Sequence, residues 1–588
     1  MERHGKMDSA RGASSCKSVS CRFVLLLFLL FSIPSTAQKS APASTSSANA
    51  SSAKETSLQE LFNAHQWQEV IRRATADPHP TPDVDFYYGS ALAQLERWDE
   101  ARKAFQQGQQ LDPLDVRFPV ELAGVAFKQK HYEQAAKNLH RALRLKPNDE
   151  YANDFLGTVY FLQGNLEGAL KYWNRVGKPR VAGIEYDPSP KLDATLLDHA
   201  FAFSRASTLQ LSQLRQTNDR LQSLGIFPTF SFDLSARPDG NFDVAFHNRQ
   251  KQGWKENKWI AAFMLLRGLP AQTIYPEAFN LKNEAVNFTS AYRWDAQKRR
   301  VQANFSGPLG KDPRHGFGLG VDLRDENWAV LNSFTGPATL LGGLNLRREA
   351  VYGKYSALAG ARLHWSAEAE LSHRDFRSEV PGPALTPSLI PKGFQLKEEI
   401  EAQSALWRNP DRRMRLDVDV NSQTGRLWSQ AGEAFEKLQG TAQYHWLPRP
   451  TGEDYAVQER VSAGNTFGNV PFDELWELGL GGDNDLWMRG HIATRDGRKG
   501  SGPLGRDYFL SNLEMDKNIY RWQMVRLIAS PFVDTGTIRD DVAGLGSHKW
   551  LTDVGASLKV KAFGFGVALS YGKDLRSGNN AIYVTMLR

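Results

Sequence analysis

The chain has 588 residues and carries 72 Lys and Arg against 65 Asp and Glu, a formal net charge of +7. This balance is too even in so long a chain to indicate a nucleic-acid binder, and an apolar content of 41% excludes a wholly disordered chain. Mean hydropathy is −0.47 and the one long apolar run lies near the N-terminus, which excludes a bundle of transmembrane helices but not a β-barrel, whose strands are only half apolar.

Residues 1–37 are predicted to be a signal peptide. Basic residues precede the apolar run 23–33, and Ser35-Thr36-Ala37 then offers small residues at the positions that signal peptidase requires. The run is too short to span a bilayer but suits a secretory leader, with a short membrane anchor as the alternative. We therefore expect a mature chain that begins at Gln38.

The two cysteines, Cys16 and Cys21, both precede the apolar run. A mature chain without cysteine can have no disulfide, no thiol nucleophile and no Cys-ligated zinc. Because neither cysteine follows the run, a lipoprotein anchor is not expected. Residues 38–55 are rich in Ser and Ala and are predicted to be a flexible linker.

Residues 56–177 repeat with a period of 34 residues. In each unit the small residues let the paired helices approach closely, and a large residue on the second helix fills the groove between units. Residues 57–75 are predicted to form a degenerate or capping unit. The small positions are Gly89, Ala123 and Gly157 on the first helices and Ala101, Ala135 and Ala169 on the second, followed by the large residues Phe105, Leu139 and Trp173.

This period and pattern resemble the tetratricopeptide repeat (TPR), an α-solenoid whose concave face usually binds a peptide or a protein. The alternative for each face residue is that it simply packs or is solvated. By the register of the family, the concave face would carry Gln94, Arg117, Phe127, Lys128, Tyr151, Asp154 and Phe161.

Residues 179–250 are predicted to form a small α+β module with the order βααββ. Strands are expected at 181–186, 229–236 and 242–248, and helices at about 192–202 and 208–224. The module resembles a POTRA domain, whose hallmarks would here be a Leu-Gly-hydrophobic-Phe motif and an Asp-Gly turn. The residues concerned are Leu224, Gly225, Phe227, Asp239 and Gly240. The resemblance implies an exposed sheet edge on which client strands can pair.

Residues 255–588 lose helical periodicity and alternate between apolar and polar residues. The segments 317–323, 363–371, 414–421 and 563–571 are the clearest, and each approaches the nine to eleven residues that a tilted barrel strand needs. At roughly 20 residues per strand and connection, about sixteen strands are expected. A soluble β-sandwich is the alternative, but the leader and the abundant Trp and Tyr favour an outer-membrane barrel.

The last hundred residues resemble the barrel of the BamA/TamA outer-membrane assembly superfamily (bacterial surface antigen family). The signature is an Arg-Gly-aromatic tip on the long sixth extracellular loop, followed by Phe-x-Asp-x-Gly on a late strand. Arg489-Gly490 and Phe532-x-Asp534-x-Gly536 match it. The resemblance implies that Arg489 folds into the lumen and pairs with Asp534. The chain departs from the pattern at His491, where an aromatic residue is usual, and in lacking a terminal Phe.

No catalytic constellation is predicted. The sequence has no Gly-x-Ser-x-Gly elbow, no Walker loop and no His-Glu-x-x-His motif, and its histidines lack ligand spacing, so neither an enzyme, a cofactor nor a metal site is expected.

Two functions from different classes remain. The first is a barrel in the bacterial outer membrane that inserts or translocates unfolded outer-membrane or secreted client proteins, with periplasmic POTRA and TPR modules that bind clients or accessory proteins. The second is an outer-membrane-anchored TPR scaffold or passive pore. Lipid of the outer membrane is an expected contact in both cases, and nucleic acid in neither.

Overall fold

A computed structural model describes residues 52–588, except 252–261, 263–264, 270–271, 296–297, 333–338, 381–384, 386, 429–432, 482–483, 523–524, 542–544, 548, 563–564 and 588. The predicted leader and most of the predicted linker lie outside the described residues. Two compact units are distinguished, residues 1–65 and residues 66–588. The first unit contributes one described helix, α2 (Ser52–Asn63), which begins inside the segment that was expected to be a linker.

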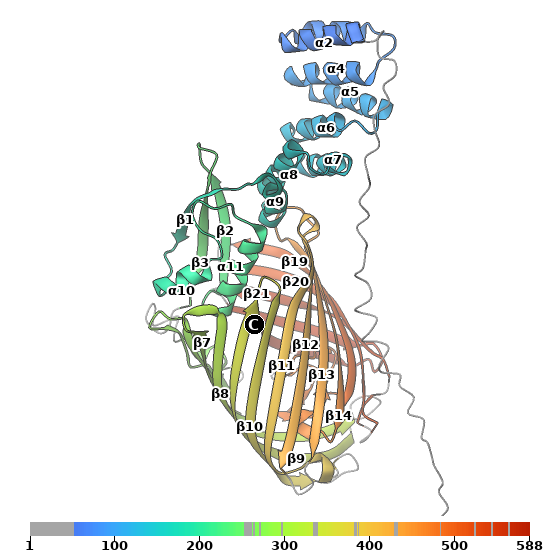
Figure 1. The fold of residues 1–588 in the computed structure, drawn as a ribbon. Coiled ribbons are helices and arrows are strands. Elements are labelled where there is room, and N and C mark those ends of the chain that lie inside the picture. Colours follow the sequence, from blue (N-terminus) through green and yellow to red (C-terminus); the bar gives the residue numbers. More distant parts are fainter. Residues whose placement is uncertain are drawn as a thin grey trace, which may run out of the picture. The chain divides into compact units, whose positions relative to one another are not determined.

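The repeat region consists of helices joined by short turns (Figure 1). The paired helices approach closely at the small positions: a Cβ added at Gly89 would lie 2.7 Å from Phe105, and one added at Gly157 would collide with Trp173. The large residue of the second helix therefore lies against the glycine of the same unit. Side chains cap several helix starts, as Asp149 does by accepting from Ala152 N at 2.9 Å. The helices are α3 (Trp67–Thr75), α4 (Pro82–Gln94), α5 (Trp98–Leu111), α6 (Arg117–Lys128), α7 (Tyr132–Leu145), α8 (Glu150–Leu162) and α9 (Leu166–Trp173).

The module that follows has the predicted order βααββ. Its sheet has the order β1-β3-β2, with β1 parallel to β3 and β3 antiparallel to β2. The elements are β1 (Val181–Asp187), α10 (Ala194–Ala200), α11 (Leu211–Ser223), β2 (Thr229–Ala236) and β3 (Phe242–Arg249).

The repeat helices from α6 onward share one hydrophobic core with the βααββ module, whereas buried residues of α4 to α6 form a separate cluster. Trp173, at the end of α9, packs against Phe242 at the start of β3, with ring centroids 5.4 Å apart. The same cluster of buried residues extends from Ala123 in α6 to Val244 and Phe246 in β3. The predicted boundary between residues 177 and 179 therefore cuts through a continuous core.

The C-terminal region is a large, mostly antiparallel sheet that curves into a barrel (Figure 1). Its long strands pair in chain order, and β14 pairs with β19 across a long intervening segment. They are β6 (Val286–Trp294), β7 (Lys298–Leu309), β8 (Asp312–Asn332), β9 (Thr339–Ala359), β10 (Leu363–Val380), β11 (Gly393–Asn409), β12 (Met414–Trp428), β13 (Ala434–Trp446), β14 (Tyr455–Gly468), β19 (Asp507–Trp522), β20 (Val525–Arg539), β21 (Leu551–Ala562), β22 (Phe565–Asp574) and β23 (Asn580–Leu587).

The short strands β4 (Thr273–Ile274) and β5 (Glu277–Leu281) pair with β6 at the start of the sheet. The predicted change from helical repeats to an antiparallel sheet is confirmed, whereas the expected number of about sixteen strands stays a prediction.

Over much of their length the barrel strands expose apolar side chains and bury polar ones, although one end of β8, β9 and β10 also buries apolar residues such as Trp328, Leu346 and Phe376. On β8, Leu319 is 58% exposed, whereas Asp322 and Glu326 are 6% and 1% exposed. On β10, Leu371 is 44% exposed and Arg374 is fully buried. A soluble sandwich would place these residues the other way round, because its apolar faces form the core.

Among the described residues, no helix has both the length and the apolar character that crossing a membrane requires.

Candidate functional site

The described residues between β14 and β19, 469–481 and 484–506, pack against inward-facing side chains of the barrel strands and are called the inner segment here. It contains the short helix η5 (Phe472–Glu474) and two-residue strands β15 (Trp476–Glu477), β16 (Thr494–Arg495), β17 (Arg498–Lys499) and β18 (Leu504–Gly505). β15 pairs with β18, so the segment enters and returns as a hairpin. Leu478 and Met488 are fully buried. The inner segment is therefore packed against the barrel wall rather than projecting from it.

Arg489, at the tip of the inner segment, forms a two-pronged ion pair with Asp534 of β20. Its Nε and Nη2 donate to the two carboxylate oxygens at 2.9 and 2.7 Å, and its backbone N–H donates to the same group at 3.0 Å. Nη1 contacts Glu514 of β19, and the guanidinium lies 3.5 Å from the centre of the Phe532 ring. Parallel donation by a planar fork fixes orientation as well as charge.

The two motif glycines allow the backbones to meet. Gly490 N–H donates to Asp553 at 2.6 Å, and a Cβ at Gly490 would lie 2.7 Å from that carboxylate. A Cβ at Gly536 would lie 2.8 Å from the Phe509 carbonyl oxygen on the neighbouring strand. The structure thus brings Arg489, Gly490, Asp534 and Gly536 together at one point of the wall.

His491, where the sequence departs from the superfamily pattern, also faces the wall. Its Nδ1 lies 3.1 Å from Asp553 Oδ2 on β21, and its Nε2 lies 3.6 Å from Asp574 Oδ2 at the end of β22. Sequence reasoning missed both carboxylates, because a separation of more than 60 residues carries no signal of proximity.

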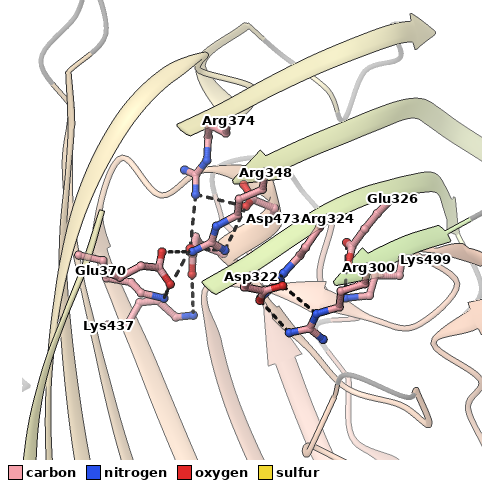
Figure 2. A network of polar contacts seen from close by, with 12 residues as sticks. Arg300, Asp322, Arg324, Glu326, Arg348, Glu370, Arg374, Lys437, Asp473 and Lys499 are labelled. Carbon is pink, nitrogen blue, oxygen red and sulfur yellow. Dashed lines mark hydrogen bonds and ion pairs between the residues drawn. The ribbon is translucent and has the colours of Figure 1, made fainter. Parts of the chain in front are cut away.

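A second cluster of charges holds the other end of the inner segment (Figure 2). Arg374 of β10, itself fully buried, lies 3.2 Å from Asp473 and 3.4 Å from Glu474, both on η5. Arg348 of β9 lies 3.2 Å from Glu474 and also pairs with Glu370 of β10. The sequence showed charged residues on these strands but not which of them would meet.

A third cluster involves the return of the inner segment past β8. Lys499 lies 3.8 Å from Glu326, which also pairs with Lys298 of β7 at 2.9 Å. Beside it, Asp322 accepts from Arg300 at 2.8 Å and from Arg324 at 2.5 Å (Figure 2). Three clusters therefore tie one segment to β8, to β9 and β10, and to β19–β22. These buried ion pairs hold the inner segment in one position, because a shift of the segment would leave buried charges unpaired.

The residues predicted for the concave face of the repeats differ in their surroundings. Gln94, Lys128 and Tyr151 are exposed, Tyr151 by 65%. Arg117 is held by Asp83 and Asp115, at 2.6 and 2.7 Å.

The other predicted face residues are already engaged within the repeats. Asp154 pairs with Lys178 at 2.8 Å. Phe127 packs against Phe155, with ring centroids 5.2 Å apart, and Phe161 packs against Trp173. Tyr151, although exposed, also packs against Phe155, with ring centroids 5.9 Å apart.

The motif residues of the βααββ module have structural roles. Leu224 and Phe227 are buried in its core, and Gly225 adopts φ +69° where α11 ends. Gly240 adopts φ +79° in the turn between β2 and β3, and Asp239 accepts from Asn241 N at 3.0 Å in the same turn.

The tetratricopeptide repeat family matches residues 64–116 and 120–181. This match confirms the repeats predicted from the 34-residue period. Among curated proteins, none matches this sequence significantly.

Solved structures that are similar to this chain include one BamA and two CdiB structures. BamA from Haemophilus ducreyi lacking POTRA domains 1–3 is 11% identical, with 70% of this chain and 84% of that chain covered and a TM-score of 0.40. CdiB from Escherichia coli is 13% identical (70% and 75% covered, TM-score 0.43), and CdiB from Acinetobacter baumannii is 12% identical (69% and 73% covered, TM-score 0.40).

Proposed function

We propose that this chain is an outer-membrane β-barrel that inserts or translocates client proteins without catalysing a reaction. The observation that carries the proposal is the ion pair between Arg489 of the inner segment and Asp534 of β20. The superfamily resemblance implies this same pair. The helical repeats and the βααββ module, which we propose is a POTRA domain, would lie in the periplasm.

The membrane location is supported by the inverted polarity of the barrel strands. Exposed apolar side chains such as Leu319 and Val420, 58% and 52% exposed, would face lipid. Buried charges such as Arg374 and Glu326 would face the lumen, where they are paired. This is the alternation that barrel strands require in a bilayer.

Client binding is proposed for the periplasmic modules. β1 and β2 are the edge strands of the three-stranded sheet, and an edge strand can pair with an extended client segment. The exposed Gln94, Lys128 and Tyr151 would contribute a second surface for clients or accessory proteins on the repeats.

The alternative is an outer-membrane-anchored scaffold or a passive pore. A passive pore needs an open lumen, whereas here the inner segment lies inside the barrel and is bound to several strands. The observations therefore favour client handling over passive diffusion. A scaffold without assembly activity remains the competing function.

Depletion of the protein in its own bacterium, followed by quantitative proteomics of the outer membrane, tests the proposal. We expect a defined set of barrel or secreted proteins to fall at least threefold. Complementation with the unaltered chain should restore them, and Arg489→Ala should not. The matched control is Arg495→Ala, an exposed arginine of the same segment. An outer-membrane proteome that does not change on depletion would favour the scaffold.

A further inference from the structure

His491, Asp553 and Asp574 converge on one enclosed point between the inner segment and the wall. One nitrogen or oxygen atom from each lies within 4.8 Å of the other two. The three residues are 7%, 0% and 2% exposed. They come from the inner segment, from β21 and from the end of β22, so the tertiary fold alone brings them together.

The three side chains are close enough to share one ion. His491 Nδ1 lies 3.1 Å from Asp553 Oδ2, and His491 Nε2 lies 3.6 Å from Asp574 Oδ2. Ligand atoms about 2.0–2.2 Å from a tetrahedral ion are about 3.3–3.6 Å from one another. Because an ion binds only one nitrogen of an imidazole, the His491 ring would turn so that a single nitrogen and both carboxylates face the ion.

The carboxylates here outnumber the cations. Arg489 pairs with Asp534 and Glu514, and Lys559 pairs with Glu514 and Asp516. Among the described residues, neither Asp553 nor Asp574 lies within ion-pair distance of a lysine or arginine. Five carboxylates against two permanent cations leave three negative charges when His491 is neutral.

An independent observation is the second oxygen of Asp553. Oδ2 accepts from Gly490 N–H, but Oδ1 is enclosed and has no hydrogen-bond partner among the described residues. A buried carboxylate oxygen without a donor is costly, and a bound cation removes that cost.

We propose that His491, Asp553 and Asp574 bind a divalent cation of the kind that accepts mixed imidazole and carboxylate ligands, for which Zn²⁺ is the probe. Three protein ligands leave a fourth position for water. The ion ties the tip of the inner segment to β21 and β22, next to the tie that Arg489 makes to β19 and β20. This inference depends on the geometry of the site and not on the proposed handling of clients.

The test uses the full mature chain, purified in detergent without a histidine tag, stripped with EDTA and dialysed against a few micromolar Zn²⁺. We expect one Zn²⁺ per chain by elemental analysis. His491→Phe and Asp553→Asn should each weaken binding at least tenfold in a competition with a chromophoric chelator. The matched control is His247→Phe, since His247 also lies between two carboxylates, Asp187 and Asp233, but on an exposed sheet.

A readout on the unaltered chain covers the case in which the variants do not fold. Replacement of Zn²⁺ by Co²⁺ should produce the visible absorption of a four-coordinate site, and Zn²⁺ should slow tryptic cleavage within the inner segment at least threefold. A folded, heat-modifiable chain that binds no Zn²⁺ would overturn the proposal, because His491 would then act only as an ion-pair partner. Binding that survives in folded His491→Phe would overturn it as well.

Discussion

Asp534 shows how one buried carboxylate can organise its surroundings. It is fully buried and accepts from the side chain and backbone of Arg489 and from Asn512 Nδ2 at 2.8 Å. Each of these donors supplies a hydrogen bond that replaces water around the buried carboxylate. The guanidinium is in turn enclosed between Asp534, Glu514 and Phe532. Arg489 has Glu514 as a second partner, whereas Asp534 has no other cation within ion-pair distance among the described residues.

We predict that Arg489→Ala and Asp534→Ala are non-additive. Arg489→Ala leaves the buried Asp534 without a cation, and Asp534→Ala leaves Arg489 with Glu514 alone. The double change removes both charges, so the double variant should be little worse than either single one. For contacting residues the coupling free energy is about 0.5–3 kcal/mol. Protease sensitivity of the inner segment, read as a free energy of local opening, measures it.

The control for this cycle is Arg495→Ala, which removes an exposed charge from the same segment. It should leave protease sensitivity unchanged. Strictly additive effects of the two alanine changes, or two silent single variants, would show that the pair does not hold the segment.

Asp85 presents the opposite case, a buried acid without a compensating charge. It lies in the first turn of α4, is 5% exposed, and its Oδ2 has no hydrogen-bond partner among the described residues. Burial raises the pKa of Asp85 to about 6. Since the pKa is higher in the folded state, the protonated form is favoured there. Protonation of Asp85 therefore contributes to the folding stability of the repeats. This contribution is complete below the unfolded pKa near 3.8 and is lost as the pH rises through about 6.

We therefore predict that Asp85→Asn stabilises the repeats at pH 7.5 by on the order of 1 kcal/mol, because an amide bears no charge to bury. The melting temperature of the helices can be followed by circular dichroism at 222 nm. In the unaltered chain it should be higher at pH 5 than at pH 7.5, and this difference should be smaller in the variant. Asp99→Asn, at an exposed position of α5, is the control and should change neither. A variant less stable than the parent at pH 7.5 would contradict the prediction.

At the scale of elements, the last repeat behaves as part of the βααββ module. Trp173 packs on Phe242, and Glu167 of α9 pairs with Arg215 of α11 at 2.7 Å. α9 also contacts the β11–β12 turn, where Lys171 lies 2.6 Å from Asp411. A solenoid transmits stability only between neighbours, so the early repeats should be separable and the last one should not.

We predict different outcomes for two truncated chains expressed behind the leader. A chain of residues 179–588 should form a heat-modifiable barrel, but its βααββ module should be cleaved rapidly by protease because Phe242 has lost its cover. A chain of residues 148–588, which keeps α8 and α9, should retain both properties.

The two truncated chains serve as each other's control, since both lack the early repeats. Electrophoresis of heated and unheated samples reports the barrel, and limited proteolysis reports the module. Loss of heat-modifiable mobility in the chain of residues 148–588 would show that the barrel needs the early repeats. Equal protease resistance in the two chains would show that the shared core is unimportant.

At the scale of the whole barrel, the inner segment is attached to well-separated strands. Arg489 and His491 reach β19–β22, whereas Asp473 and Glu474 reach β9 and β10, and β11–β14 lie between these groups in the strand order. A segment attached on both sides crosses the lumen and narrows it. Displacing the segment therefore requires breaking several buried ion pairs.

We predict that the combined change Asp473→Asn and Glu474→Gln raises the single-channel conductance in planar bilayers at least severalfold. It leaves Arg374 without an ion-pair partner among the described residues and Arg348 with Glu370 alone. Breaking a buried pair of this kind costs about 3–5 kcal/mol. Asp496→Asn, an exposed position of the same segment that keeps φ +53°, is the control and should conduct like the unaltered chain. Unchanged conductance in a folded double variant would show that the second cluster does not keep the lumen closed.

The sequence alone determined the elements, because their signals are local. The 34-residue spacing of Gly89, Ala123 and Gly157 identifies the repeats, and alternation over 363–371 and 414–421 locates β10 and β12. The Leu224-Gly225 stop and the turn at Gly240 place the ends of α11 and of β2. Each of these patterns repeats within a few residues or at a fixed short period, so no knowledge of distant partners is needed.

Only the tertiary structure decided which distant residues meet. Strand register sets the height of each inward side chain, and a shift by one residue would turn it to the other face. That register brings Arg374 to Asp473 and His491 to Asp553 and Asp574. Likewise, the packing of Trp173 on Phe242 merged two modules that sequence patterns separate. Such contacts depend on the closure of long loops and on the relative placement of many paired strands. No local sequence pattern encodes either.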